Sequence, residues 1–231
     1  MKPTLFLIFV FLVLITSGCS KNSDDNTPPV TNCTWSTNFS DNFHRTDTII
    51  GNNFQVIIQP TPFGGNGFAD IYNNSLRISS DNVFWAILYT KEVEGSKVRV
   101  SVECTTPLSG GTCAFGVGGK FIYAGNMTQS GYFAAAMNNV IGIFKSVSGE
   151  MTTLATQAFQ LQFNHTYKIA LIIDGGNLAA TITDQVFGST VTVTATDSGA
   201  ILSGKQYSIN GNSLGGQVVL LLNNFIIEIC Q

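Results

Sequence analysis

Apolar residues recur at every second position along most of the chain after Cys33, and this alternation limits the fold more than any other feature of the sequence. In the segment 97–103, for example, Val98, Val100 and Val102 alternate with charged and hydroxyl residues. A period of two places apolar side chains on one face of a β-strand and polar side chains on the other. No segment after Cys33 has the 3.6-residue period of an amphipathic helix, so the sequence predicts an all-β domain.

The predicted strands are short and are bounded by Gly, Asn and Ser. Val83–Tyr89 is apolar on both faces, which indicates a central strand with cover on each side. Asp174-Gly175-Gly176-Asn177 is a predicted hairpin turn because Gly accepts positive φ, and Ser148-Gly149 is a weaker case. About a dozen strands exceed what one open sheet usually holds, so we expect two sheets packed face to face. We expect a short strand with apolar Phe39 and Phe43 before a polar turn. Further strands are expected at Ser75–Ser79, Val83–Tyr89, Lys97–Glu103, Thr112–Val117, Tyr132–Met137, Val140–Ser146, Met151–Thr156, Tyr167–Ile173, Leu178–Thr183, Thr190–Ala195 and Val218–Cys230, the last with a bulge at Asn223-Asn224.

The two ends of this domain resemble a known fold. The run Asp41-Asn42-Phe43-His44-Arg45-Thr46-Asp47, followed by Gly51-Asn52-Asn53-Phe54, resembles the opening of concanavalin A-like jelly-roll domains of the laminin-G-like and 3-keto-disaccharide-hydrolase-like group. It departs from their pattern at Asn42, His44, Thr46 and Phe54. The last strand, entered through Gly215-Gly216, also resembles the closing strand of that fold. The resemblance implies an antiparallel two-sheet sandwich over residues 33–231, with its first and last strands side by side.

The first 32 residues have a different character. Residues 1–19 resemble a lipoprotein signal peptide, with Lys2, an apolar run from Leu5 to Ile15, and a Cys19 that would be lipidated. The run is too short to span a bilayer as a helix. Residues 20–32 form a polar tether, and Ser23-Asp24-Asp25 resembles the export tag of Bacteroidetes-type surface lipoproteins. We therefore expect a lipid-anchored protein of the outer membrane or cell surface. The alternatives are an ordinary signal peptide with an incidental Cys and a plain polar linker.

Composition excludes several classes of function. The net charge is −3 and the eleven Lys and Arg are scattered, so nothing favours nucleic-acid binding. Only two His are present, and no Cys-x-x-Cys spacing occurs, which argues against a zinc site. Membrane contact is expected through the lipid anchor alone.

Four cysteines remain once Cys19 is assigned to lipidation, and an exported protein is expected to pair them. Three pairings are open. Cys104 and Cys113 flank a turn-rich loop and would face each other across a hairpin. Cys33 and Cys230 would meet because the resemblance implies adjacent terminal strands. We therefore expect the pairs Cys33–Cys230 and Cys104–Cys113.

Acidic residues offer no clear catalytic pair. Glycoside hydrolases that share this fold carry Glu-x-Asp-x-Glu on one strand, and nothing in the chain matches. Glu92 and Glu94 lie in a predicted charged turn, and Glu103 lies on the polar face of a strand. Asp41 and Asp47 are predicted to bond within their turn, with a structural calcium ion as the sharper alternative. No other cofactor is implied.

The remaining chemistry favours a surface that binds sugars through rings, amides and hydroxyls. Tyr123 and Tyr132 bracket a polar loop, and Arg77 and Arg99 lie on outward strand faces. These four residues are the candidate ligand-binding set, and the expected function is glycan binding without cleavage. Two alternatives stay open: a glycoside hydrolase or lyase with an unrecognised carboxylate pair, and a structural or adhesive surface protein without a small ligand.

Overall fold

A computed structural model describes residues 33–51, 53–61, 64–106, 112–123, 129–137 and 139–231 of the chain. The expected signal peptide, with Cys19, and the expected linker lie outside these residues. The described part consists of fifteen β-strands joined by turns and loops. No helix in these ranges is long and apolar enough to cross a membrane.

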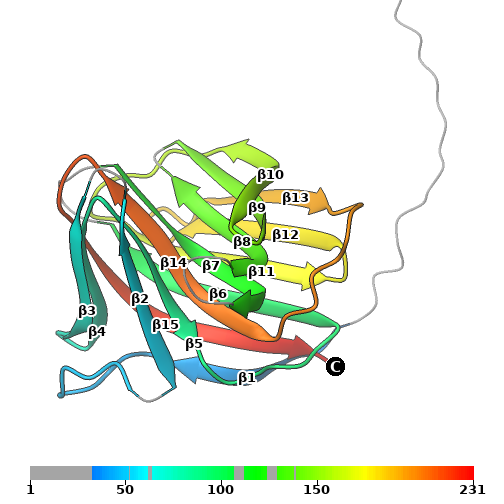
Figure 1. Ribbon diagram of the computed structural model, residues 1–231, viewed down its shortest axis with the longest axis horizontal. Coiled ribbons are helices and arrows are strands. Elements are labelled where there is room, and N and C mark those ends of the chain that lie inside the picture. Colours follow the sequence, from blue (N-terminus) through cyan, green and yellow to red (C-terminus); the bar gives the residue numbers. More distant parts are fainter. Residues whose placement is uncertain (1–32, 52, 62–63, 107–111, 124–128, 138) are drawn as a thin grey trace, which may run out of the picture. The chain divides into compact units, whose positions relative to one another are not determined.

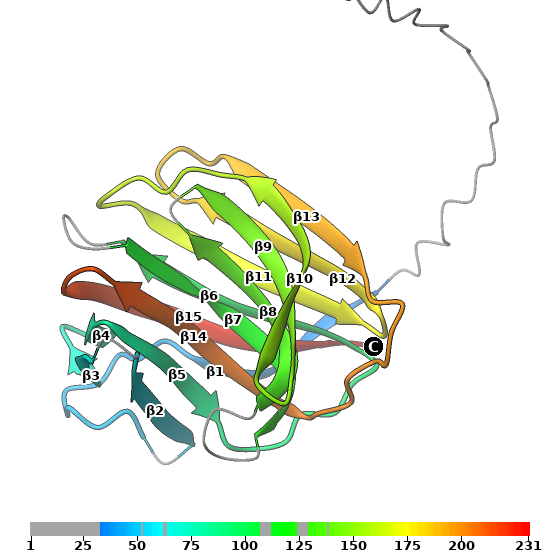
Figure 2. The same cartoon turned by 45° about the horizontal axis from the view of Figure 1, so that its top comes forward.

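The strands form two antiparallel sheets stacked face to face, as Figures 1 and 2 show, so the predicted sandwich is confirmed. The seven-stranded sheet has the order β10-β9-β8-β7-β14-β5-β2. Its strands are β2 (Phe54–Pro60), β5 (Val83–Tyr89), β7 (Thr112–Tyr123), β8 (Gln129–Met137), β9 (Val140–Val147), β10 (Glu150–Ala158) and β14 (Gln206–Leu214).

The eight-stranded sheet has the order β13-β12-β11-β6-β15-β4-β3, with β1 paired to β15 beside this path. The first and last strands are therefore neighbours, as the resemblance implied. The strands of this sheet are β1 (Trp35–Asp41), β3 (Asn66–Tyr72), β4 (Ser75–Asp81), β6 (Lys97–Thr105), β11 (Thr166–Asp174), β12 (Asn177–Asp184), β13 (Thr190–Thr196) and β15 (Val218–Cys230).

Alternating side chains from the two inner faces form the core. Val98, Val100 and Val102 of β6 are fully buried there, as their period-two pattern predicted. The predicted bulge in β15 is confirmed, since its register with β6 shifts between Asn223 and Ile226. Three strands were not predicted, namely β2, β3 and β14.

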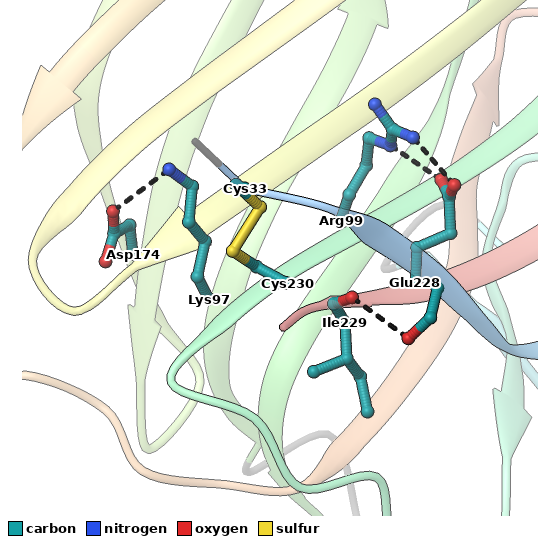
Figure 3. The surroundings of a disulfide bond; sticks show 8 residues. Cys33, Lys97, Arg99, Asp174, Glu228, Ile229 and Cys230 are labelled. Carbon is teal, nitrogen blue, oxygen red and sulfur yellow. Dashed lines mark hydrogen bonds and ion pairs between the residues drawn. A yellow bond between two sulfur atoms is a disulfide. The ribbon is translucent and has the colours of Figure 1, made fainter. Parts of the chain in front are cut away.

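A disulfide joins Cys33, which precedes β1, to Cys230 at the end of β15, with 5.4 Å between the two Cα atoms (Figure 3). The bridge continues the ladder of β1 and β15, in which Trp35 pairs with Cys230. The expected bridge between the two ends of the domain is thus present.

The expected bridge between Cys104 and Cys113 is absent. Both residues are free thiols, and both are buried. The prediction assumed a hairpin, but β6 and β7 belong to opposite sheets. Cys104 pairs in register with Tyr167 and Leu222 of its own sheet, and Cys113 pairs with Ser213 of the other. Both cysteines therefore contribute to the core as small apolar side chains.

Candidate functional site

A row of small side chains crosses the outer face of the seven-stranded sheet. The strand registers place Ala86 beside Asn210, Asn210 beside Gly116, Gly116 beside Ala135, and Ala135 beside Gly142. These five residues come from β5, β14, β7, β8 and β9, so the row runs across the strands. Four of them project at most a methyl group. The row therefore forms the floor of a groove.

Larger side chains flank this row on both sides. Phe133 and Phe144 pair across β8 and β9 on one side, and Phe84 and Asn212 pair across β5 and β14 on the other. The result is a groove with a volume of about 440 Å³. All seven strands contribute to its lining, which comprises Ile57, Phe84, Trp85, Ala86, Ala114, Tyr123, Gln129, Phe133, Ala135, Met137, Phe144, Ser146, Gly149, Met151, Asn210, Gly211 and Asn212.

Glycines in β7 set the depth and one wall of the groove. A Cβ on Gly116 would lie 1.9 Å from the carbonyl oxygen of Ala134, so no side chain fits at this floor position. A Cβ on Gly118 would lie 2.4 Å from the ring of Phe121, which folds back over the outer face of the sheet. Phe121 packs edge-on against Phe133, with 4.8 Å between ring centroids. Together with Phe144 these rings form a buried apolar wall.

Polar groups enter the groove at two places. Asn210 and Asn212 project from the outer face of β14, and the Asn210 side-chain nitrogen donates to the Ser208 hydroxyl at 3.3 Å. Tyr123 and Gln129 face each other at the ends of β7 and β8. Among the described lining residues, every polar side chain is an amide, a hydroxyl or the indole of Trp85, and none is ionisable near neutral pH. The groove is therefore neutral, with aromatic and amide surface available to a ligand.

Tyr123 is the one predicted ligand residue that lines this groove. Tyr132 does not, because it is fully buried in the core, where its hydroxyl donates to Asp197 at 2.7 Å. The prediction that Tyr132 is an exposed platform is therefore wrong. The prediction rested on the place of Tyr132 beside a polar loop. A Tyr side chain can nevertheless be buried in a core when a partner, here Asp197, satisfies its hydroxyl.

Arg77 and Arg99 lie on the other sheet, so the predicted ligand set does not form one site. Both are occupied by acids of their own sheet. Arg77 donates to both carboxylate oxygens of Asp70 at 2.8 and 2.6 Å. Arg99 donates to both of Glu228 at 2.6 Å (Figure 3).

The two arginines are also far apart on that sheet. Arg77 pairs with Leu221 of β15, whereas Arg99 pairs with Glu228 of the same strand. The seven intervening steps correspond to about 23 Å of strand. Each guanidinium also lies over a ring, that of Tyr72 at 4.3 Å or of Trp35 at 4.5 Å. Neither is oriented toward a groove that both could share.

The acidic residues considered for catalysis also lie away from the groove. Glu94 and Glu92 both pair with Lys205 on an exposed loop, at 2.5 and 3.4 Å. Glu103 accepts a hydrogen bond of 2.7 Å from Asn224 on the eight-stranded sheet. None of the three is among the residues that line the groove.

Asp41 bonds within its own turn. It accepts from the Phe43 backbone N–H at 2.7 Å and pairs with Arg45. Among the residues that the structure describes, no three His, Cys, Asp or Glu side chains cluster as a metal site would require. The turn-bonding role predicted for Asp41 accounts for its contacts.

Sequence reasoning missed β14 and therefore missed Asn210 and Asn212. Their segment, Ser208-Ile209-Asn210-Gly211-Asn212, is rich in turn residues and contains Asn-Gly. A strand signal was nevertheless present, since Tyr207, Ile209 and Ser213 alternate with outward polar residues and are buried. That alternation would have placed both asparagines together on the outer face of the strand.

No protein-family model matches the chain, and no curated protein matches it in sequence. Solved structures do match. The carbohydrate-binding module CBM66 from Bacillus subtilis is 16% identical with a TM-score of 0.58, covering 79% of this chain and 97% of its own. The catalytic domain of an endo-1,3-beta-glucanase from Thermotoga petrophila is 10% identical with a TM-score of 0.60, covering 86% and 99%. Basic winged bean lectin is 11% identical with a TM-score of 0.52, covering 83% and 98%. These likenesses establish a fold shared with jelly-roll proteins.

Proposed function

We propose that this protein is an exported, lipid-anchored surface protein that binds glycans without cleaving them. The observation that carries the proposal is the groove across the seven-stranded sheet. Seven strands spaced by about 4.8 Å span about 29 Å, which suits an extended ligand better than a compact one. Rings such as Phe84 and Tyr123 suit stacking on sugar faces, and the amides of Asn210 and Asn212 suit hydrogen bonding to hydroxyls.

The groove supports binding over hydrolysis. Cleavage of a glycosidic bond usually requires two carboxyl groups about 5 to 10 Å apart on either side of the bond. The described lining contains none. Fold likeness supports sugar recognition in general, since the similar structures include a carbohydrate-binding module and a lectin. It does not decide between binding and catalysis, since they also include a glucanase.

The proposed location, outside the cytoplasm and anchored by lipid, rests on the sequence and on one covalent bond. The apolar run from Leu5 to Ile15 ends just before Cys19, where lipidation is proposed. The Cys33–Cys230 disulfide supports export, because such bonds persist mainly in oxidising compartments. The variant Cys19→Ala should release the protein from membranes and abolish labelling by palmitate. Continued labelling of this variant would overturn lipidation at Cys19.

A blocked groove tests the binding proposal. Ala135 lies half-buried on the groove floor, so Ala135→Phe should fill the groove and weaken binding to any glycan found on an array. Ala179 of β12 is half-buried on the outer face of the other sheet and provides the matched control, Ala179→Phe. We expect at least tenfold weaker binding for the first variant and unchanged binding for the second. Equal binding by both would place the site elsewhere, and release of shorter sugars would establish hydrolysis instead.

A further inference from the structure

We propose that the groove selects neutral sugars that carry an acetamido group over sugars that carry a hydroxyl in its place. This inference rests on the proposed function, since it concerns the same groove. It follows from three properties of the described lining: the absence of charge, the arrangement of two amides, and the small apolar floor beside them.

The absence of charge excludes acidic and basic polymers. No Asp, Glu, Lys, Arg or His is present among the lining residues that the structure describes. A carboxylate or ammonium group that enters an apolar groove loses water and gains no opposite charge, which is strongly unfavourable. Uronate polymers and deacetylated amino sugars should therefore bind poorly. Arg77 and Arg99, which could pair with a carboxylate, are on the other sheet and are already paired with Asp70 and Glu228.

Two amides with hydrogen-bonding groups that no described residue uses face the groove from one strand. Asn210 and Asn212 are two residues apart on β14, so their side chains leave the same face about 7 Å from each other. Asn210 donates to Ser208, which leaves its carbonyl oxygen without a donor from the described residues, and Asn212 makes no side-chain hydrogen bond with them. An amide offers both a donor and an acceptor. An acetamido group offers the complementary pair, an N–H and a C=O.

The floor beside these amides suits a methyl group. In the strand registers Ala86 and Gly116 flank Asn210, and Ala114 lies beside Asn212. Ala135 and Met137 follow on β8, one strand further along. These side chains offer apolar contact and no hydrogen-bond partner. A hydroxyl that pointed here would lose water without replacement, whereas the methyl of an acetamido group would gain by burial. The amides and the floor together therefore favour the acetamido substituent.

The test compares oligosaccharides that differ only at this substituent. Isothermal titration of the mature protein would use tetramers of N-acetylglucosamine, glucose, glucosamine and glucuronate, and the matched galacto pair of N-acetylgalactosamine and galactose. We expect about tenfold tighter binding of the acetylated member of a pair, from one buried methyl and one added hydrogen bond. We expect no measurable binding of the glucosamine and glucuronate tetramers. Equal affinity for the acetamido and hydroxyl members of both pairs would overturn this inference while leaving glycan binding intact, whereas failure of every sugar, including array hits, would overturn the proposed function itself.

Variants separate the role of the amides from general groove binding. Asn210→Ala and Asn212→Ala should lower the affinity for the acetylated sugars to that for the hydroxyl sugars. Asn66→Ala, on the edge strand β3 of the other sheet, is the control and should bind as the unchanged protein does. Thermal unfolding would verify that these variants, and the double variant Asn210→Ala/Asn212→Ala, fold. Retained selectivity in the double variant Asn210→Ala/Asn212→Ala would also overturn the inference.

Discussion

The hydroxyl of Tyr132 donates a 2.7 Å hydrogen bond to Asp197. This side-chain bond links the two sheets, which the backbone hydrogen bonds within each sheet do not do. Tyr132 lies on β8, and Asp197 follows β13 of the opposite sheet. Lys145 of β9 pairs with the same carboxylate at 2.6 Å. The Gly199 backbone N–H donates a third bond, of 3.0 Å. Asp197 therefore fixes the beginning of the crossing from β13 to β14, the strand that carries Asn210 and Asn212.

The Asp197 cluster predicts a loss of stability in acid. Burial alone would raise the pKa of Asp197, but hydrogen bonds from Lys145, Tyr132 and Gly199 outweigh it and lower the pKa below its usual 3.8. A lowered folded-state pKa stabilises the fold above about pH 4 and the contribution is lost as the pH falls further. Asp197→Asn should cost about 3 kcal/mol at pH 7 and show a weaker decline in acid, measured by urea unfolding. The control Asp174→Asn breaks the exposed pair with Lys97, 3.4 Å apart, and should cost less than about 1 kcal/mol. Equal losses would refute the special role of Asp197.

The same cluster predicts sensitivity to alkali. Burial first, and then the bond to Asp197, raises the pKa of Tyr132 to about 12. A raised folded-state pKa gives stability that is complete below the unfolded value of 10.0 and is lost as the pH rises through about 12. Tyr132→Phe should remove this part of the alkaline decline and cost about 1 to 3 kcal/mol at neutral pH. Ultraviolet titration of tyrosinate in the unchanged protein and in Tyr132→Phe would show the ionisation of Tyr132, and urea unfolding at neutral and alkaline pH would give the stabilities. Normal ionisation of all tyrosines near pH 10.0 would contradict the buried bond.

The terminal disulfide predicts a large effect on stability. It closes a loop with a sequence separation of 197 residues, and the chain-entropy model assigns about 5 kcal/mol to such a closure. The double variant Cys33→Ser/Cys230→Ser should lose most of this amount in denaturant unfolding. Ser36→Ala, which removes only a 3.3 Å bond from β1 to the Ile229 carbonyl, is the control and should lose about 1 kcal/mol or less. A double variant as stable as the unchanged protein would refute the bridge.

The two unlinked thiols predict slow chemistry. Burial raises the pKa of Cys104 well above its usual value, with Cys113 contributing further, and burial also raises the pKa of Cys113. Since thiolate is the reactive form, both should resist thiol reagents in the native protein and react after unfolding. The expected result is two labelled cysteines among residues 33–231 in denaturant without reductant. A peptide that links Cys104 to Cys113 in non-reducing mapping would contradict this state.

The strands whose inward faces are continuous apolar rows were predictable, and the groove was not. Val98, Val100 and Val102 reveal β6 because a buried face leaves a clear period of two. Val83–Tyr89 was also identified as a strand, but the cover predicted for both of its faces is incomplete, since Phe84 is 39% exposed beside the groove while Leu88 on the same outer face is buried. Apolarity on two faces is the same in sequence whether another layer or a ligand covers the second face.

Contacts that depend on the order of strands in a sheet could not be predicted from the sequence. Asn210 lies beside Gly116 only because β14 is inserted between β5 and β7, strands that are far from it along the chain. The assignment of β6 and β7 to different sheets also decided the state of Cys104 and Cys113. Alternation specifies the faces of a strand but does not specify its neighbours. The fold was therefore predictable from local pattern and resemblance, whereas the site required the topology.

The bridge from Cys33 to Cys230 has a mechanical consequence. A pull on the chain from its N-terminal side reaches Cys33 and would otherwise peel β1 from β15 one hydrogen bond at a time. Through the disulfide the pull passes to β15, which is held on both sides by β4, β6 and β1. To move β15 along its axis, many ladder bonds must break together. We therefore expect a domain anchored at its N-terminus to hold its shape under tension from a captured polymer, and to yield at much lower force once the bridge is reduced.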